Sequence, residues 1–156
     1  MIKRSLTGFS LLACLALAGC SEDWGADQHG AQVTAQQLDG QWLVINYWAE
    51  WCGPCRTEIP ELNALDGAHG DITVLGVNFD GLQGEELAAA ATDLGIDFRV
   101  LSLDPAERLD LPRSAVLPMT YLVDGKGKVR QQLVGEQSAE ALQEQLAQLG
   151  RKTSAQ

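Results

Sequence analysis

Two cysteines separated by two residues are the part of this sequence best suited to chemistry. Cys52 and Cys55 enclose Gly53 and Pro54, with an apolar run before the pair and a helical pattern after it. A thiol at a helix N-terminus meets unpaired backbone N–H groups and the positive end of the helix dipole, which favour the thiolate. We therefore predict that Cys52 is a nucleophile with a lowered pKa, and that Cys55, about one helical turn away, attacks the mixed disulfide that Cys52 forms.

Two other roles for the cysteine pair fit the sequence less well. A structural zinc site needs four ligands, and the remaining candidates are His29 and His69, which stand apart in polar surroundings and are expected to face solvent. A structural disulfide across so short a loop would close too little chain to stabilise a domain of this size. We accordingly predict a redox-active pair that uses neither a metal nor a cofactor.

The elements around the pair are predicted from hydrophobic periodicity. The apolar run over 42–48 is rich in β-forming residues and predicts a strand buried on both faces. The segment 55–65 has apolar residues at helical spacing, with Pro54 in its first turn and Pro60 expected to kink it. Further strands are predicted at 72–77, 98–103, 120–123 and 128–134, and further helices at 84–94 and 138–149. This order predicts parallel crossovers followed by an antiparallel hairpin.

The N-terminus has the layout of an export signal. Lys3 and Arg4 precede an uncharged apolar stretch that is shorter than the roughly 20 residues needed to span a bilayer. The stretch ends in Leu17-Ala18-Gly19-Cys20, which resembles the lipobox of bacterial lipoprotein precursors. The resemblance implies cleavage before Cys20 and attachment of lipid to its sulfur; the alternative is an ordinary signal peptide with a chance cysteine. We predict a signal peptide at 1–19, a lipidated tether at 20–36 and one folded domain at 37–156.

Charge and cysteine content narrow the function further. The chain has 11 basic and 21 acidic residues, a formal charge of −10, which repels phosphate groups and predicts no nucleic-acid partner. Cys14 would leave with the signal peptide and Cys20 would carry lipid, so Cys52 and Cys55 would be the free thiols of the exported protein. An exported compartment favours disulfide chemistry.

A resemblance to a known family begins at the cysteine motif. Thioredoxins carry an active-site sequence similar to Trp48-Ala49-Glu50-Trp51-Cys52-Gly53-Pro54-Cys55 with Pro60 beyond it. From roughly residue 36 to the end, the chain resembles the membrane-tethered TlpA/ResA-like thioredoxins, through Glu58, the extra strand and helix within 72–103, and the sequence Leu117-Pro118-Met119-Thr120-Tyr121-Leu122-Val123-Asp124. The resemblance implies an α/β thioredoxin-like fold, in which helices flank a mixed central sheet with a βα insertion.

The resemblance also implies roles for residues outside the cysteine pair. Pro118 is expected to be cis and to lie beside the cysteines, where the preceding backbone pairs with the substrate chain. The implied substrate groove consists of Trp51, Gly53, Pro54, Leu117 and Pro118. From the residues alone, Pro118 would be a trans proline that starts a strand. Trp48 and Trp51 are expected to be apolar cover for the site.

The sequence departs from the family pattern at two places. Thioredoxins have a buried aspartate where this chain has Asn46, which cannot titrate. The resemblance to the tethered family implies that Glu58, three residues after Cys55, lies near the thiols. Glu58 is the candidate for proton transfer, because partial burial would raise its pKa; the alternative is a solvated carboxylate. Val116-Leu117 stands where the family often has a glycine upstream of the proline, which leaves the shape of the groove open.

Gly53-Pro54 resembles reducing thioredoxins and predicts a reductant, with a potential near about −270 mV rather than the about −120 mV of a strong oxidant. The family resemblance then implies a DsbD- or CcdA-like transmembrane electron donor, and protein disulfides as targets, including those of apocytochromes c. Ser21, directly after the lipidated cysteine, resembles the signal that sorts lipoproteins to the outer membrane. Retention in the inner membrane would instead place the protein closer to an electron donor. Rival functions are a thiol oxidant and a tethered, non-redox binding module; the P-x-x-x-T-x-x-C motif of peroxiredoxins does not match this sequence.

Overall fold

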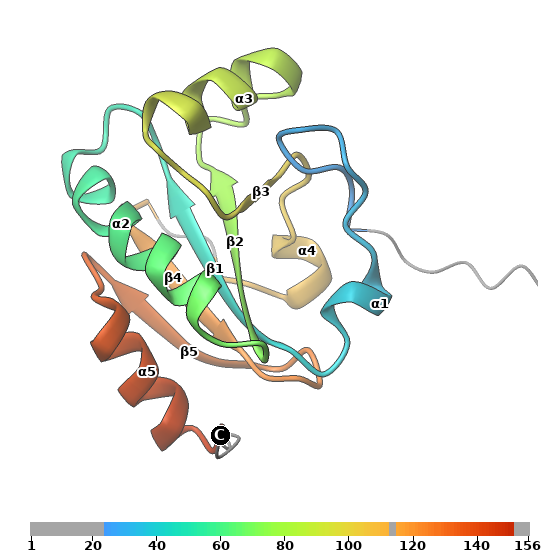
Figure 1. Ribbon diagram of the computed structural model, residues 1–156, viewed down its shortest axis with the longest axis vertical. Helices are drawn as coiled ribbons and strands as arrows, with labels where there is room; N and C mark the ends of the chain where they lie inside the picture. Colours follow the sequence, from blue (N-terminus) through green and yellow to red (C-terminus); the bar gives the residue numbers. More distant parts are fainter. Residues whose placement is uncertain (1–23, 113–114, 152–156) are drawn as a thin grey trace, which may run out of the picture.

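The computed structural model describes residues 24–112 and 115–151, which form a five-stranded sheet with helices on both faces (Figure 1). The predicted signal peptide, Cys20 and Ser21 lie outside the described residues. The strands are β1 (Trp42–Trp48), β2 (Ile72–Asn78), β3 (Arg99–Leu101), β4 (Met119–Val123) and β5 (Val129–Val134). The helices are α1 (Ala35–Leu38), α2 (Gly53–Ala68), α3 (Gly84–Asp93), α4 (Ala106–Leu109) and α5 (Ala139–Gln148).

The sheet is mixed, as predicted, in the order β3-β2-β1-β4-β5. β2 pairs in parallel with β1 and β3, whereas β4 runs antiparallel to both β1 and β5. β1 is therefore the central strand, and most of its residues are buried, which agrees with the prediction of a strand covered on both faces. In the register of the sheet, Asn46 stands between Gly76 of β2 and Thr120 of β4.

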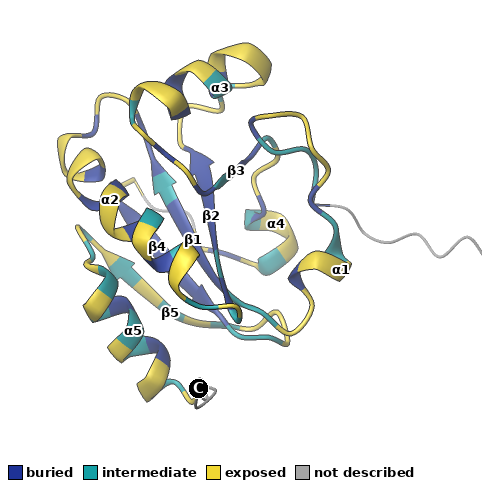
Figure 2. Cartoon of the chain, in the orientation of Figure 1, coloured by how far each residue is buried: buried dark blue, intermediate teal, exposed yellow. Residues whose placement is uncertain are grey.

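Two hydrophobic clusters lie on the two faces of the sheet. One face is covered by α2, α3 and α5, whose buried side chains pack with Val44 and Trp48. The other face is covered by α1, the segment that precedes it and Leu111, which follows α4, and these pack against Ile45 and Tyr121. Figure 2 shows buried residues along β1 and β2 and exposed residues on the outer sides of the helices. The side chains of alternate residues of β1 thus pack on opposite faces of the sheet.

The segment from Trp24 to Gln36, which we predicted to be part of a tether, instead packs against the domain. Trp24 and Val33 are buried, and Arg108 lies 5.2 Å from the centre of the Trp24 ring. The Gln28 side chain donates to the Phe98 carbonyl at 3.1 Å and accepts from the Val100 N–H at 2.7 Å. The predicted tether is therefore wrong from Trp24 onward, because this segment covers the exposed edge of β3.

The remaining predicted elements are present with small shifts. α2 begins earlier and ends later than predicted and continues through Pro60, while β3 is shorter than the predicted strand over 98–103. Ser138 caps α5 by accepting a hydrogen bond from Ala141 N–H, as its residue type predicted. The short helices α1 and α4 were not predicted. Within 24–112 and 115–151, no helix combines the length and the apolar character that crossing a bilayer requires.

Candidate active site

The cysteine pair lies where β1 leads into α2. Cys52 is the N-cap residue of α2, and its sulfur accepts a hydrogen bond from the Cys55 backbone N–H at 3.2 Å. The two residues form a disulfide, with their Cα atoms 5.3 Å apart. Cys52 keeps 4% of its surface exposed, whereas Cys55 is fully buried. The helix N-terminus thus stabilises negative charge on the sulfur that is closer to the surface.

Pro118 immediately precedes β4, and the Leu117–Pro118 peptide bond is cis, as the resemblance implied. Because Met119 pairs with Tyr47, Pro118 lies at the end of the sheet from which β1 continues towards Cys52. Pro118 is buried and Leu117 is half-buried. The cis bond confirms the predicted conformation, and the sheet register brings this loop to the same end of the domain as the cysteines.

Glu58 is buried beneath the first turns of α2, with 1% of its surface exposed. Its Oε1 accepts a hydrogen bond from Asn46 Nδ2 at 2.6 Å, and its Oε2 accepts one from the Gln137 backbone N–H at 3.0 Å. Burial raises the pKa of Glu58 from 4.5 to about 7, against the opposing effect of these two hydrogen bonds, and the nearby charge of Glu136 adds to the rise. The expected rise in pKa is confirmed, and the alternative of a solvated carboxylate is wrong.

Asn46 connects this carboxylate to the sheet. It is fully buried on β1, and its Nδ2 also donates to Thr120 Oγ1 on β4 at 3.1 Å. Its Oδ1 has no hydrogen-bond partner among the described residues. The contacts of Thr120 and Gln137 with this pair were not predicted, because they join segments far apart in the chain.

A hollow opens beside Glu58, between α2 and the N-terminus of α5. It has a volume of about 420 Å³. Its lining consists of Thr57, Glu58, Glu61, Glu136, Gln137, Ser138 and Ala141. Several of these residues are exposed, so the Glu58 carboxyl faces a route to solvent although its own surface is covered.

The two tryptophans of the motif differ in their surroundings. Trp48 is fully buried, as expected for apolar cover, but 66% of Trp51 is exposed. The Trp51 indole N–H donates to Asp80 Oδ2 at 2.9 Å, and its ring meets the Phe79 ring edge-on with centroids 6.2 Å apart. The prediction of apolar cover is therefore wrong for Trp51. Exposed Trp51, Gly53 and Pro54 leave the face around Cys52 open to a partner.

The two histidines differ in their surroundings. His29 is exposed, and His69, which we expected to face solvent, is half-buried with no hydrogen-bond partner for Nε2 among the described residues. Within those residues, no group of three or more His, Cys, Asp or Glu side chains is arranged to hold a metal ion.

Sequence comparison identifies the family. The sequence model of the AhpC/TSA family matches residues 15–132. The chain belongs to the AhpC/TSA family. This family member is 30% identical over 122 residues to the thiol-disulfide oxidoreductase ResA of Bacillus anthracis, a match covering 75% of this chain and 68% of that protein. It is 33% identical over 104 residues to the thiol:disulfide interchange protein HelX of Rhodobacter capsulatus, covering 65% of this chain and 56% of that protein.

Solved structures give the same fold for this AhpC/TSA family member. A thiol:disulfide interchange protein of the thioredoxin family from Chlorobium tepidum matches with a TM-score of 0.67 and 24% identity, over 83% of this chain and 94% of that chain. The thioredoxin-like fold and the ResA-like membership predicted from the sequence are therefore confirmed. The chain is a thiol-disulfide oxidoreductase of the ResA type with a Cys52–Cys55 pair.

Proposed function

We propose that the protein reduces protein disulfides from the periplasmic face of a bacterial membrane, to which Cys20 anchors it through lipid. The observation that carries the redox role is the Cys52–Cys55 disulfide at the N-terminus of α2, with the buried Glu58 carboxyl in the next turn of the same helix. This arrangement joins a nucleophile, a resolving thiol and a group that titrates near neutral pH.

The proposed cycle exchanges two thiols for one disulfide. The Cys52 thiolate attacks one sulfur of the substrate disulfide, which forms a mixed disulfide and releases the other substrate sulfur as a thiolate. The Cys55 thiol then loses its proton and attacks the Cys52 sulfur. The Cys52–Cys55 disulfide forms again, and the second substrate sulfur leaves. The substrate gains two electrons and two protons, and the protein becomes oxidised.

Glu58 is the proposed acceptor of the Cys55 proton. It lies three residues beyond Cys55 on the same helix, and its pKa of about 7 allows it both to take and to release a proton near neutral pH. The hollow lined by Glu61 and Glu136 supports exchange of that proton with solvent. Asn46 acts as a positioning residue, because its amide holds Glu58 Oε1 at 2.6 Å.

The reducing direction is supported by Gly53-Pro54, which resembles the motif of reducing thioredoxins. A reductant in an oxidising periplasm needs electrons from across the membrane, so the proposal includes a DsbD- or CcdA-like donor. The proposed targets are protein disulfides, including those of apocytochromes c. The substrate groove is proposed to comprise Trp51, Gly53, Pro54, Leu117 and Pro118.

The membrane anchor is supported by the similarity of Leu17-Ala18-Gly19-Cys20 to a lipobox. Ser21 favours the outer membrane, whereas a transmembrane donor favours the inner membrane. Fractionation of membranes from cells that express the full chain separates these locations, and Cys20→Ala should release the protein from both. Retention of the Cys20→Ala protein in the membrane would contradict the lipid anchor.

Insulin reduction tests the enzymatic role. The reduced protein should accelerate insulin reduction by dithiothreitol, and Cys52→Ala should return the rate to the dithiothreitol background. A non-redox binding module would instead bind unfolded insulin chains equally well with Cys52→Ala and would give no acceleration. Wild-type protein without activity above background would contradict the proposed function.

A further inference from the structure

A second pocket lies on the face of the sheet opposite α2. It has a volume of about 380 Å³, near the lower end of the roughly 300–1,000 Å³ typical of small-ligand sites. Its lining consists of Tyr47, Phe79, Asp104, Ala106, Pro112, Ala115, Leu117, Met119 and Tyr121. None of these except Leu117 was singled out from the sequence as a site residue, because they come from four separate parts of the chain.

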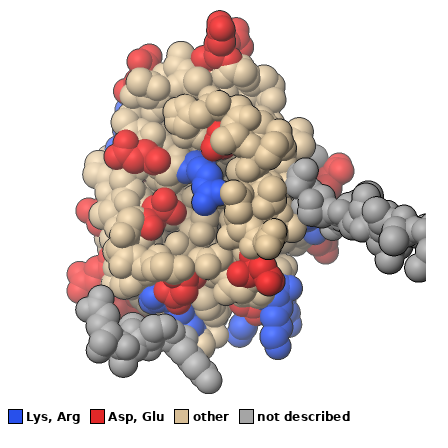
Figure 3. All heavy atoms as spheres, turned by 45° about the vertical axis from the view of Figure 1, so that its right-hand side comes forward, with Lys and Arg blue, Asp and Glu red and all other residues tan. Residues whose placement is uncertain are grey.

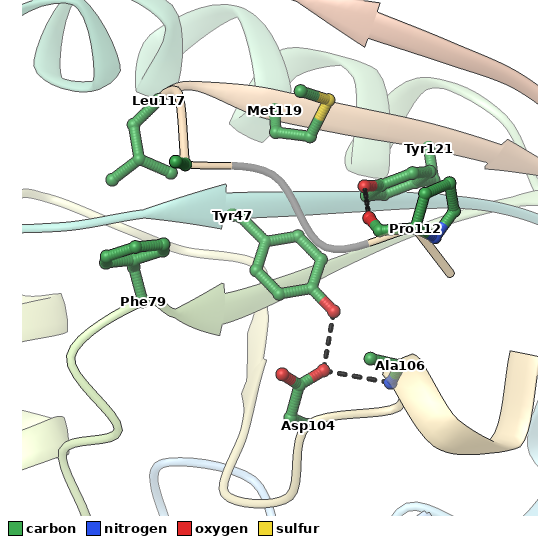
Figure 4. Close-up of a pocket in the computed structure, with 9 residues that line it drawn as sticks. Tyr47, Phe79, Asp104, Ala106, Pro112, Leu117, Met119 and Tyr121 are labelled. Carbon is green, nitrogen blue, oxygen red and sulfur yellow. Dashed lines mark hydrogen bonds between the residues drawn. The ribbon is translucent and has the colours of Figure 1, made fainter. Parts of the chain in front are cut away.

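The pocket combines aromatic walls with one carboxylate. Figure 4 shows the rings of Tyr47 and Phe79 and the side chain of Met119 around the space, with Asp104 at its rim. Both aromatic residues are partly exposed. The face of an aromatic ring attracts a cation, as does a carboxylate. The lining therefore suits a ligand with an apolar stem and a positively charged end.

Asp104 is held in place through one of its two carboxylate oxygens. Its Oδ1 accepts hydrogen bonds from the Tyr47 hydroxyl at 2.5 Å and from the Ala106 backbone N–H at 2.9 Å, at the start of α4. Among the described residues, no hydrogen-bond donor lies on Oδ2. Tyr121 donates its hydroxyl to the Pro112 carbonyl, so that group is already paired. Among the described residues, Oδ2 is thus the oxygen of Asp104 to which the binding of a cation is assigned.

Two residues that line the pocket neighbour residues of the cysteine site. Leu117 lines it and directly precedes Pro118, while Phe79 lines it and contacts the Trp51 ring next to Cys52. In the view of Figure 4, Leu117 and Phe79 stand at one end and Asp104 and Pro112 at the other. A polypeptide that pairs with the backbone before Pro118 would thus pass the mouth of this pocket.

We propose that this pocket binds a lysine or arginine side chain of the polypeptide whose disulfide Cys52 attacks, an inference that rests on the proposed function. The aromatic rings of Tyr47 and Phe79 contact the methylene stem, and Asp104 Oδ2 binds the cationic end. The acidic surface, with a formal charge of −10 for the chain, favours the approach of a basic substrate. Figure 3 shows acidic side chains spread over the drawn face and fewer basic ones.

The test uses the reduced full domain and short peptides that each contain one disulfide. Lysine is placed at one position after another around the cysteines, and at each position it is compared with norleucine, which has the apolar stem without the charge. The measured quantity is the second-order rate constant for oxidation of the protein in a single turnover. Wild type should prefer lysine about tenfold at the best position, equal to about 1.4 kcal/mol, and salt should weaken this preference.

Asp104→Asn removes the charge and keeps an oxygen that can accept from Tyr47 and Ala106. It should reduce the preference for lysine to less than twofold, while oxidation by the small neutral molecule hydroxyethyl disulfide stays within twofold of wild type. Ala106→Phe, which fills the pocket and keeps the charge, should also remove the preference. Asp93→Asn, which removes one negative charge at the end of α3 instead, should retain the preference for lysine.

Equal rates with lysine and norleucine at every position would overturn the pocket proposal, as would an equal loss of preference in Asp93→Asn. Either result would leave the proposed function intact if hydroxyethyl disulfide still oxidised the protein. No oxidation by any disulfide, including hydroxyethyl disulfide, would overturn both proposals together.

Discussion

Asn46 on the central strand donates a hydrogen bond of 2.6 Å to Glu58 on α2, the helix that Cys52 caps. The amide holds the carboxyl beneath the first turns of α2 without placing a second titratable group beside it. The titratable group of this pair therefore lies on the helix and the neutral amide on the strand.

Glu58→Gln should change how stability depends on pH in the oxidised protein. The folded-state pKa of Glu58 is about 7, above the ordinary value of 4.5, so the folded state binds the proton more tightly than the unfolded state. The contribution of Glu58 to the free energy of unfolding is fully present below pH 4.5 and is lost as pH rises to about 7. The wild-type free energy of unfolding should therefore fall by about 3 kcal/mol across this range, relative to Glu58→Gln.

Urea unfolding at several pH values measures this difference. Glu144→Gln is the matched control, because Glu144 is an exposed carboxylate on α5 and its removal should leave the pH dependence of wild type unchanged. Parallel curves for wild type and Glu58→Gln would show that Glu58 titrates normally.

The two thiols of the reduced protein should differ in reactivity. In Cys55→Ser, the remaining Cys52 should react with iodoacetamide at pH 7 at least about tenfold faster than Cys55 does in Cys52→Ser, because Cys52 lies at the helix N-terminus and Cys55 is fully buried. The pH dependence of the Cys52 rate should give a pKa below about 8.5. Similar rates for the two thiols would contradict the assigned roles.

Gly76→Ala should destabilise the domain by about 1–3 kcal/mol, because the new methyl group would overpack the core. On β2, it would lie 3.0 Å from side-chain atoms of Phe98 and Val100 and 3.1 Å from Trp48 Nε1. Gly67→Ala on α2 is the matched control, since its methyl group meets nothing within 4 Å. That helical substitution should stabilise by up to about 1 kcal/mol. Urea unfolding compares the variants, and equal effects would show that Gly76 is not closely packed.

Trp24→Ala should lower the free energy of unfolding by about 3 kcal/mol, as for other buried tryptophans. Gln32→Ala, in the same segment but exposed, should change it by less than about 0.5 kcal/mol. Urea unfolding of chains that begin before Trp24 measures both. A small effect of Trp24→Ala would mean that this segment contributes little to the folded domain.

The sequence predicted the sheet and the cysteine site because both leave local patterns. The apolar run of β1, the helical spacing after Cys55 and the residues around Pro118 each carry their signal within a few positions. Glu58 was also predictable, since its position on α2 relative to Cys55 follows from helical geometry.

Other features depend on contacts that have no local pattern. The Gln28 side-chain amide forms hydrogen bonds with backbone groups at the edge of β3. The segment around Gln28 is polar, so its sequence predicted a tether although it is part of the fold. Asp104 and Tyr47 are 57 positions apart in the chain and meet only after the sheet has formed. The exposure of Trp51 was missed for the same reason, because its partner Asp80 comes from the loop after β2.

If Cys20 carries lipid as proposed, the fixed position of Trp24 limits how far the domain could move from a bilayer. Only four residue steps separate Trp24 from Cys20, and a fully extended chain of that length covers at most about 14 Å. A lipid on Cys20 would therefore keep the domain close to the bilayer surface, and the enzyme would work within a thin layer of solvent above the lipid headgroups. Molecules that exchange electrons with it would have to enter that layer, so encounters would depend on diffusion along the membrane plane.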